Sequence, residues 1–230
     1  MQRFYNVHPE WVNPDPNDLI QLNRCIRVME KHDAKFRRVV ILIATNVAIF
    51  FANNPEILKT KPDFLIQFQI WLLDRLSRDV YVQVGGLVLI NSFIGAGFQD
   101  RIVLSRNIKI KNISILFGFL SKCTPIRFAG GFILDAPYFL RALWPVVRMF
   151  LSEKIRNRYH FCGTTSNELD NLIIDKTILL VSLGGRVPDS DYSYCWITNQ
   201  VNLYRDELNS PKEDDKMLKT SGGSDQPLST

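Results

Sequence analysis

The sequence predicts an α/β fold in which helices flank a mostly parallel sheet. Short apolar segments rich in β-branched residues alternate along the chain with longer segments whose apolar residues recur at helical spacing. Such alternation is typical of strand–helix–strand units, whose strands form a largely parallel sheet. The 230 residues suffice for one domain with a substantial core, and 46% of them are hydrophobic.

The first part of the chain is polar and is punctuated by prolines. Here Asn17 or Asp18 could cap a short helix that runs through Met29. The character changes at RVVILIA (38–44), which is typical of a buried strand. We therefore place the start of the folded domain at residue 36.

The remaining elements alternate in the same way. We expect helices at 64–76, 108–123 and 137–155, and buried strands at 85–91, 126–137 and 158–162. One side of the first of these helices carries Phe64, Phe68, Trp71, Leu72 and Leu76. After residue 206 few apolar residues remain, so we expect a domain at 36–205 followed by a disordered tail at 206–230.

A membrane-spanning segment is not expected. The most apolar run, Val39 to Ala52, is interrupted by Thr45 and Asn46 and is shorter than the ~20 residues that a spanning helix needs. The N-terminus has no continuous apolar signal core. We therefore expect a cytoplasmic protein, and its net charge of +5 is compatible with anionic partners.

The residues also do not form a recognisable catalytic or metal site. The three histidines are isolated, GxSxG and Walker motifs are absent, and the four cysteines lack the spacing of zinc ligands, so they are expected to be reduced thiols. Gly95-Ala96-Gly97 follows a predicted strand and keeps open a minor reading as a nucleotide-dependent enzyme. The full GxGxxG motif is missing, however, and a turn explains these residues better.

The helix predicted at 137–155 has a distinctive charge pattern. An apolar stripe is followed at its end by basic residues; the stripe contains Phe139, Leu143, Val147, Phe150 and Leu151, and the basic residues are Lys154, Arg156 and Arg158. Cations at a helix C-terminus interact favourably with the helix dipole, so the pattern alone favours an ordinary amphipathic core helix. The second interpretation is a lid over a lipid, with cations that meet anionic headgroups.

A resemblance favours the second interpretation. The segment TPIRFAGGFILDAPYFLRALWPVVRMFLSEKIRNRYHFCG (124–163) resembles the signature of the CRAL-TRIO, or Sec14-like, lipid-binding domain family. It is most similar to the branch with α-tocopherol transfer protein, retinaldehyde-binding protein and the clavesins. Further pieces occur in the right order, namely RRVVILIATN (37–46), VQVGGLVLINSFIG (82–95) and LGGRVPDSDY (183–192), so the resemblance covers roughly residues 36–200.

The resemblance implies a hydrophobic ligand cavity between the sheet and a helical gate formed by 137–151. The implied lipid-pocket residues are Ile90, Phe93, Phe128, Phe132, Phe139, Leu143, Val147 and Phe150. The resemblance to the tocopherol-transfer relatives also implies a basic surface beside the gate that binds phosphatidylinositol bisphosphates. This surface maps here onto Arg127, Lys154 and Arg158, whereas a fourth family cation maps onto Ala129. Arg37 and Arg38 are expected to form a solvated edge that could join this basic face.

Several positions depart from the family pattern. The Asn-x-Pro motif before the gate is Asp135-Ala136-Pro137 here, and Asn91 replaces an aspartate. Met149 replaces a proline and Pro145 lies one turn earlier, which predicts a kink near Arg141–Pro145. Residues 1–35 resemble only the end of the helical bundle that precedes the domain in relatives, so we expect them to be a remnant of it.

Taken together, these observations predict intracellular binding and transfer of a small hydrophobic lipid of the tocopherol, retinoid or phospholipid class. The alternative is a ligand-free regulatory or protein-interaction module of the same fold. We expect no enzymatic activity, no metal and no cofactor besides the bound lipid. The expected partners are that lipid and, transiently and peripherally, an anionic phosphoinositide-containing membrane, with no nucleic acid, and the expected state is a monomer.

Overall fold

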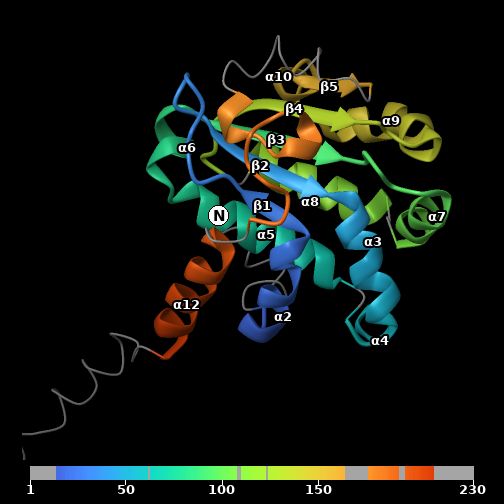
Figure 1. Cartoon of the computed structure of the whole chain (residues 1–230), viewed down its shortest axis with the longest axis horizontal. Helices are drawn as coiled ribbons and strands as arrows, with labels where there is room; N and C mark the ends of the chain where they lie inside the picture. The colour runs from blue at the N-terminus through green and yellow to red at the C-terminus, as the bar shows by residue number, and fades with distance from the viewer. Residues whose placement is uncertain are drawn as a thin grey trace, which may run out of the picture.

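The computed structural model describes residues 14–61, 63–107, 110–122, 124–163, 176–191 and 195–209. Its centre is a five-stranded sheet with the strand order β1-β2-β3-β4-β5 (Figure 1). The strands are β1 (Ile26–Val28), β2 (Arg38–Ile43), β3 (Leu87–Ser92), β4 (Phe128–Leu134) and β5 (Tyr159–Cys162). Strands β2 to β5 run parallel, and β1 pairs antiparallel with β2 at one edge. The predicted α/β class with a mostly parallel sheet is therefore confirmed.

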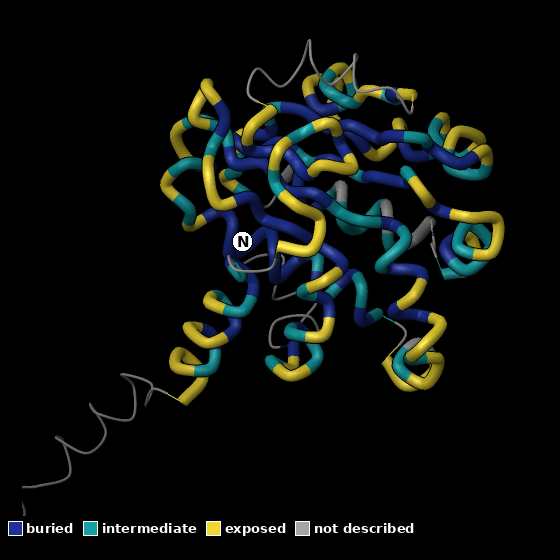
Figure 2. The backbone as a smooth tube through the Cα atoms, in the orientation of Figure 1, coloured by how far each residue is buried: buried dark blue, intermediate teal, exposed yellow. Residues whose placement is uncertain are grey.

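Helices cover one face of this sheet. The α-helices are α2 (Pro16–Gln21), α3 (Ala44–Asn53), α4 (Pro55–Thr60), α5 (Phe64–Ser77), α6 (Val80–Val84), α7 (Phe98–Asn107), α8 (Ile110–Lys122), α9 (Tyr138–Phe150), α10 (Glu153–Arg156) and α12 (Trp196–Asn209). Residues of α3, α5, α8 and α9 form the larger hydrophobic core with one face of the sheet, and the segment 178–183 covers the other face. Buried backbone is accordingly concentrated in the sheet and its surroundings, whereas α4 and much of α12 are exposed (Figure 2). Within the described residues, none of the helices combines the length and the apolar character needed to cross a membrane.

Alternate residues along each strand point to opposite faces of the sheet, so neighbouring residues join different cores. On β2, Val40 belongs to the helix-covered core, whereas Val39 and Ile41 belong to the core on the opposite face. This division follows from the two-residue repeat of a strand. Both faces of a parallel sheet are buried, so such strands are apolar throughout and the repeat leaves no mark in their sequence.

The β-bulge in β4 changes this alternation. Leu87 is paired with Phe128, but the next residue, Val88, is paired with Gly130, so Ala129 is an extra residue on β4. As a result Phe128 joins the helix-covered core and Phe132 the opposite one, although the two residues are four positions apart.

The helix predicted through Met29 is wrong. Helix α2 begins at Pro16, with Asp15 as the N-cap whose side chain accepts a hydrogen bond from the Asn17 amide at 2.8 Å, and it ends at Gln21. The chain then passes through a short 3₁₀ turn into β1, which pairs with β2. Long-range pairing with an apolar neighbour strand outweighs the weak helical pattern of this segment.

The helix predicted at 137–155 is divided into two. Helix α9 ends at Phe150, Leu151 is extended, and Ser152 caps the short helix α10 by accepting a hydrogen bond from the Ile155 amide. Serine competes for backbone groups and favours caps over helix interiors, which accounts for the break. Pro145 lies inside α9 and is exposed; the kink near it stays a prediction.

Helix α12, which the sequence pattern does not indicate, packs against α2 and β1 and contacts α5 through Trp71 and Arg75. Arg75 of α5 is buried, and each of its terminal nitrogens donates to one carboxylate oxygen of Glu207 at 2.6 Å. Its guanidinium also lies over the ring of Tyr204, 5.0 Å from the centroid. These hydrogen bonds from Arg75 hold the pKa of Glu207 below its usual range. The first residues of the predicted tail are thus helical, and residues 210–230, like 1–13, lie outside the described part of the chain.

Candidate ligand cavity and basic groove

A cavity of about 210 Å³, the main cavity, lies between the helix-covered face of the sheet and the helices above it. Helices α3, α5, α7, α8 and α9 contribute side chains to it, together with β2, β3, β4 and β5. Most of the lining is apolar: Leu22, Cys25, Ile26, Leu42, Ala44, Val47, Phe51, Leu65, Ile66, Phe68, Phe93, Leu104, Leu116, Ile133, Leu140, Trp144 and Val147. Burial raises the pKa of the Cys25 thiol to about 12, so this wall residue stays protonated and unreactive near neutral pH.

The residues predicted for the pocket are divided among several places. Phe93 and Val147 line the main cavity. Phe128 and Phe139 belong to the same hydrophobic core without lining the cavity, Leu143 is half-buried, and the side chain of Phe150 is exposed.

Two predicted pocket residues lie on the wrong side of the sheet for this cavity. Ile90 and Phe132 belong to the core on the opposite face, although Ile90 also contributes to the lining of a second cavity next to the main one. The shift at Ala129 moves Phe132 there, and Ile133 lines the main cavity in its place. Ile90 and Phe93 have opposite parity along the chain, so only one of the two could face the cavity from an extended strand.

Helix α9 faces the cavity with a stripe that is displaced by about one residue from the predicted one. Leu140, Trp144 and Val147 line the cavity, which corresponds to the i, i+4, i+7 spacing of one helix face. Arg141 and Arg148 are exposed, as expected. The aromatic and aliphatic residues of α9 occupy more than half of the helix surface, so the sequence alone permits two neighbouring registers.

Trp144 joins α9 to the last strand of the sheet. Its ring centroid lies 5.5 Å from that of Tyr159 and 5.0 Å from that of Phe161, the latter in an edge-to-face arrangement. Tyr159 also stacks on Phe128 at 5.2 Å, and burial raises the pKa of its hydroxyl. Edge-to-face and tilted aromatic pairs are favourable geometries, so this cluster anchors α9 to β5 beside the cavity.

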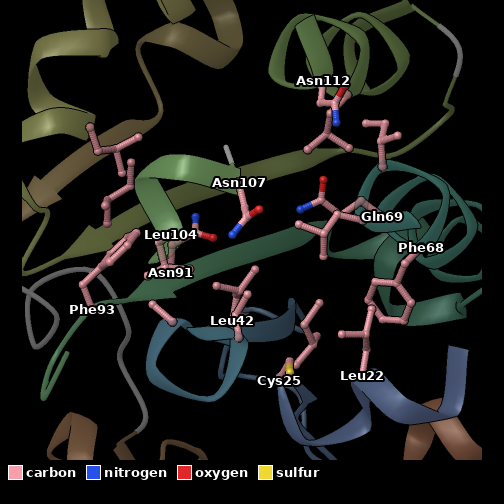
Figure 3. A pocket seen from close by; sticks show the side chains of 18 of the residues that line it. Leu22, Cys25, Leu42, Phe68, Gln69, Asn91, Phe93, Leu104, Asn107 and Asn112 are labelled. Atoms are coloured by element: carbon pink, nitrogen blue, oxygen red, sulfur yellow. The ribbon is translucent and has the colours of Figure 1, made fainter. Parts of the chain in front are cut away.

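The main cavity also contains four side-chain amides, which the apolar pattern of the sequence does not indicate. They are Gln69 of α5, Asn91 of β3, Asn107 at the end of α7 and Asn112 of α8. Figure 3 shows the amides of Gln69, Asn91 and Asn107 pointing toward one another, with Asn112 entering from the helix beside them. Asn91 was visible in the sequence as a departure from the family motif. The other three come from elements that only the fold brings together.

A second cavity of about 130 Å³ adjoins the main one between the sheet and helices α5 and α8. The two cavities share six lining residues: Ile26, Leu42, Gln69, Asn91, Leu116 and Tyr159. Two of the four amides therefore lie where the cavities meet.

A separate groove of about 300 Å³ lies at the amino ends of the parallel strands. We call it the basic groove; it is lined by Lys35, Phe36, Arg37, Val84, Gly85, Arg127, Ala129 and Arg158. Parallel strands start at the same edge of a sheet, and a cation comes directly before β2, β4 and β5, so Arg37, Arg127 and Arg158 are brought together. None of the lining residues is acidic.

The cations of the basic groove differ in whether other groups of the protein bind them. Arg37 forms an ion pair with the buried Asp33, to which its Nε donates at 2.6 Å, and Arg158 donates to the carbonyl oxygen of Phe128. Lys35 and Arg127 are exposed, and Lys35 enters the groove from the loop between β1 and β2.

Two sequence expectations about this basic face are affected. Lys154, the third predicted phosphoinositide residue, is exposed on α10 but is not among the lining residues of the groove. Arg38 is not a solvated edge. It is buried, pairs with Asp79 at 2.7 Å and donates to the carbonyl oxygens of Met29 and Glu30. It therefore cannot contribute to a surface for anions.

The turn before α9 contains the Asp135-Ala136-Pro137 motif. Asp135 has a φ of +48°, in the left-handed region, and its carboxylate accepts a hydrogen bond from Arg101 of α7 at 2.7 Å. Asparagine and aspartate tolerate this conformation better than most residues, so an aspartate suits this turn. Within the described residues, no cluster of three or more His, Cys, Asp or Glu side chains could hold a metal ion.

Comparisons with known proteins agree with this architecture. The family model described as "CRAL/TRIO domain" matches residues 23–185. The chain belongs to the CRAL/TRIO domain family. The matched region begins ahead of the expected domain start at 36 and includes β1 of this CRAL/TRIO domain.

The relatives of this CRAL/TRIO domain include the clavesins. The chain is 30% identical to clavesin-2 of Mus musculus over 145 residues, which covers 63% of this chain and 42% of that protein. It is 26% identical to clavesin-1 of Rattus norvegicus over 164 residues, covering 71% of this chain and 43% of that protein. The chain thus spans less than half the length of these curated relatives.

A solved structure shares the fold. The crystal structure of Sfh5 superimposes with a TM-score of 0.54 at 11% sequence identity and covers 84% of this chain and 70% of that one. The CRAL/TRIO family is one of lipid-binding and lipid-transfer proteins, and the main cavity lies between sheet and helices in a member of that family.

Proposed function

We propose that this CRAL/TRIO domain binds one small hydrophobic lipid in the main cavity and exchanges it at a membrane surface, as a carrier rather than as an enzyme. The observation that carries this proposal is a mostly apolar cavity between the sheet and an amphipathic helix, α9. Removing apolar surface from water contributes roughly 25 cal/mol per Å², so a lipid that fills such a cavity is bound favourably.

Helix α9 would act as the gate. Its inner face contributes Leu140, Trp144 and Val147 to the cavity, so moving it would open the cavity to the outside. Its outer face carries large apolar side chains that no part of the described protein covers: Tyr138 is 85% exposed and Met149 is 72% exposed. Apolar side chains on the surface of an amphipathic helix insert into the headgroup region of a bilayer, which would stabilise the open gate at the membrane.

The basic groove would provide the anionic contact. We propose that it binds the headgroup of a phosphatidylinositol bisphosphate, with Lys35 and Arg127 as the exposed cations and Arg158 beside them. Ala129 lies in the same groove, at the position where relatives carry a cation. Lys35 reaches the groove from a different loop and would supply a positive charge near the place where Ala129 supplies none. Lys154 on α10 would contact the membrane outside the groove.

The carrier proposal is tested by native mass spectrometry of the full chain purified from cells. We expect a co-purified lipid, and we expect Leu116→Trp to remove it, because the added indole would occupy the main cavity that Leu116 lines. Leu203→Trp is the matched control, since Leu203 is 53% exposed on α12. A lipid-free wild-type protein would contradict the proposal and favour the alternative of a ligand-free interaction module.

The anionic site is tested separately by vesicle sedimentation. The double variant Lys35→Glu with Arg127→Glu should weaken binding to phosphatidylcholine vesicles that contain phosphatidylinositol bisphosphate. Each cation near an anionic surface is worth about 1 kcal/mol, so two reversals should weaken binding at least ~10-fold. The control is Lys59→Glu with Arg186→Glu, which changes the net charge equally at exposed positions outside the groove. Equal binding by both double variants would show that only net charge matters.

A further inference from the structure

The four amides give the main cavity a polar region with a defined chemical character. Each amide offers both a hydrogen-bond donor and an acceptor. They come from four different elements, and three of them point toward one another across the cavity (Figure 3). Unpaired polar groups inside a protein are unfavourable. A cluster of amides that faces a cavity therefore calls for a specific explanation.

Most of this hydrogen-bonding capacity is unused by the protein. Asn107 donates from Nδ2 to the carbonyl oxygen of Val103 at 2.8 Å, which leaves its Oδ1 available. In the part of the chain that the structure describes, the side chains of Gln69, Asn91 and Asn112 form no hydrogen bond with other protein groups. A partner that enters the cavity would therefore find donors and acceptors already directed at it.

The cavity also has no charge to offer. Its described lining contains no Asp, Glu, Lys, Arg or His residue. A carboxylate or phosphate inside it would lose its hydration without gaining an opposite charge, which strongly disfavours burial of an anion. An alkane would be tolerated but would leave the amides without partners.

We propose that the main cavity selects an uncharged lipid that carries a hydroxyl or carbonyl group, and that this group binds the amides of Gln69, Asn91 and Asn107. The proposal rests on the function proposed above, that this cavity holds a lipid. It excludes fatty acids and phospholipids as preferred ligands.

The geometry also orients the ligand. The residues that α9 contributes are apolar, whereas the amides come from α5, β3, α7 and α8. Gln69 and Asn91 additionally line the second cavity, between the sheet and helices α5 and α8. The polar group of the lipid would therefore lie on the side of the cavity away from α9, and the hydrocarbon body would lie against the apolar face of α9.

The test compares three ligands of equal chain length: hexadecanol, hexadecanoate and hexadecane. Displacement of a fluorescent lipid probe from the wild-type chain, at a pH where the acid is ionised, measures their relative affinities. We expect hexadecanol to bind at least ~10-fold more tightly than hexadecanoate, because a buried charge has no partner here. We expect it to bind about 5- to 10-fold more tightly than hexadecane, as one or two hydrogen bonds provide.

Variants identify the responsible groups. Gln69→Leu and Asn91→Leu keep the side-chain size and remove the hydrogen bonds, so each should reduce the preference for hexadecanol over hexadecane to about 2-fold or less. Leu65→Met, an apolar change in the same lining, should leave that preference unchanged. The comparison of the three ligands uses the wild-type chain alone, so it tests the proposal even if a variant misfolds.

The outcomes separate the two proposals. If hexadecanoate binds as tightly as hexadecanol, or if all three ligands bind alike, the selection by amides is wrong while lipid binding stands. If none of the three displaces the probe and native mass spectrometry finds no lipid, the proposed carrier function fails and this inference fails with it.

Discussion

Trp144 is the side chain whose loss should most directly release α9 from the sheet. It forms two aromatic contacts with β5, to Tyr159 at 5.5 Å and to Phe161 at 5.0 Å. Each such pair contributes about 0.5–1.5 kcal/mol beyond the area it buries, so Trp144→Ala should weaken closure of α9 by about 1–3 kcal/mol. The ~3–5 kcal/mol typical of a fully buried aromatic is an upper bound, because Trp144 is only half-buried.

This loss should appear in hydrogen–deuterium exchange of the backbone amides of 138–150. A change of 1–3 kcal/mol in the opening equilibrium accelerates exchange about 5- to 150-fold. Tyr138→Ala removes an aromatic ring from the same helix, but that ring is 85% exposed, so exchange should stay near the wild-type rate. Amides of α5 serve as an internal reference for global unfolding. Equal exchange in both variants, or equal acceleration in α5 and α9, would refute the idea that these contacts hold the gate.

Three further predictions concern stability. Because the Arg75 hydrogen bonds lower the pKa of Glu207 in the folded state, the bridge contributes stability above the unfolded pKa of about 4.3 and loses it as the pH falls through the folded value. Thermal melting should therefore rank wild type above Glu207→Gln near neutral pH, and the difference should vanish in acid; a pH-independent difference would contradict this. Gly131→Ala should destabilise the fold by about 1–3 kcal/mol in chemical denaturation, because a Cβ there would meet the Tyr159 ring at 2.5 Å. Gly118→Ala in α8, where a Cβ meets nothing within 4 Å, should instead stabilise by about 0.5–1 kcal/mol.

The elements with a strong local pattern were predictable from the sequence. The β-branched segments at 38–44 and 85–91 became β2 and β3, and the predicted helix at 64–76 became α5. These predictions succeed because hydrophobic periodicity and strand propensity act over a few neighbouring residues. The predictions at 17–29 and 137–155 failed where a partner strand or a capping serine decided the outcome instead.

The candidate site was only partly predictable. Segment 124–163 indicated the right helix and the right layer, and Val147 and Phe93 do line the main cavity. The facing residues Leu140 and Trp144 were missed because a broadly apolar helix does not define its own register. The amides at 69, 107 and 112 are single polar residues in three separate helices, and nothing local distinguishes them from solvated ones.

By itself, then, the sequence determined the α/β class, the order of most strands and helices, and the family signature, since each is written in contiguous residues. Only the tertiary structure decided which side of the sheet each strand residue occupies, because one extra residue at Ala129 reverses the parity of β4. It also decided which cations form the basic groove, since Arg37, Arg127 and Arg158 meet only when parallel strands start at one edge. Strand register and sheet topology depend on contacts between residues that are far apart in the sequence, so no single segment is enough to predict them.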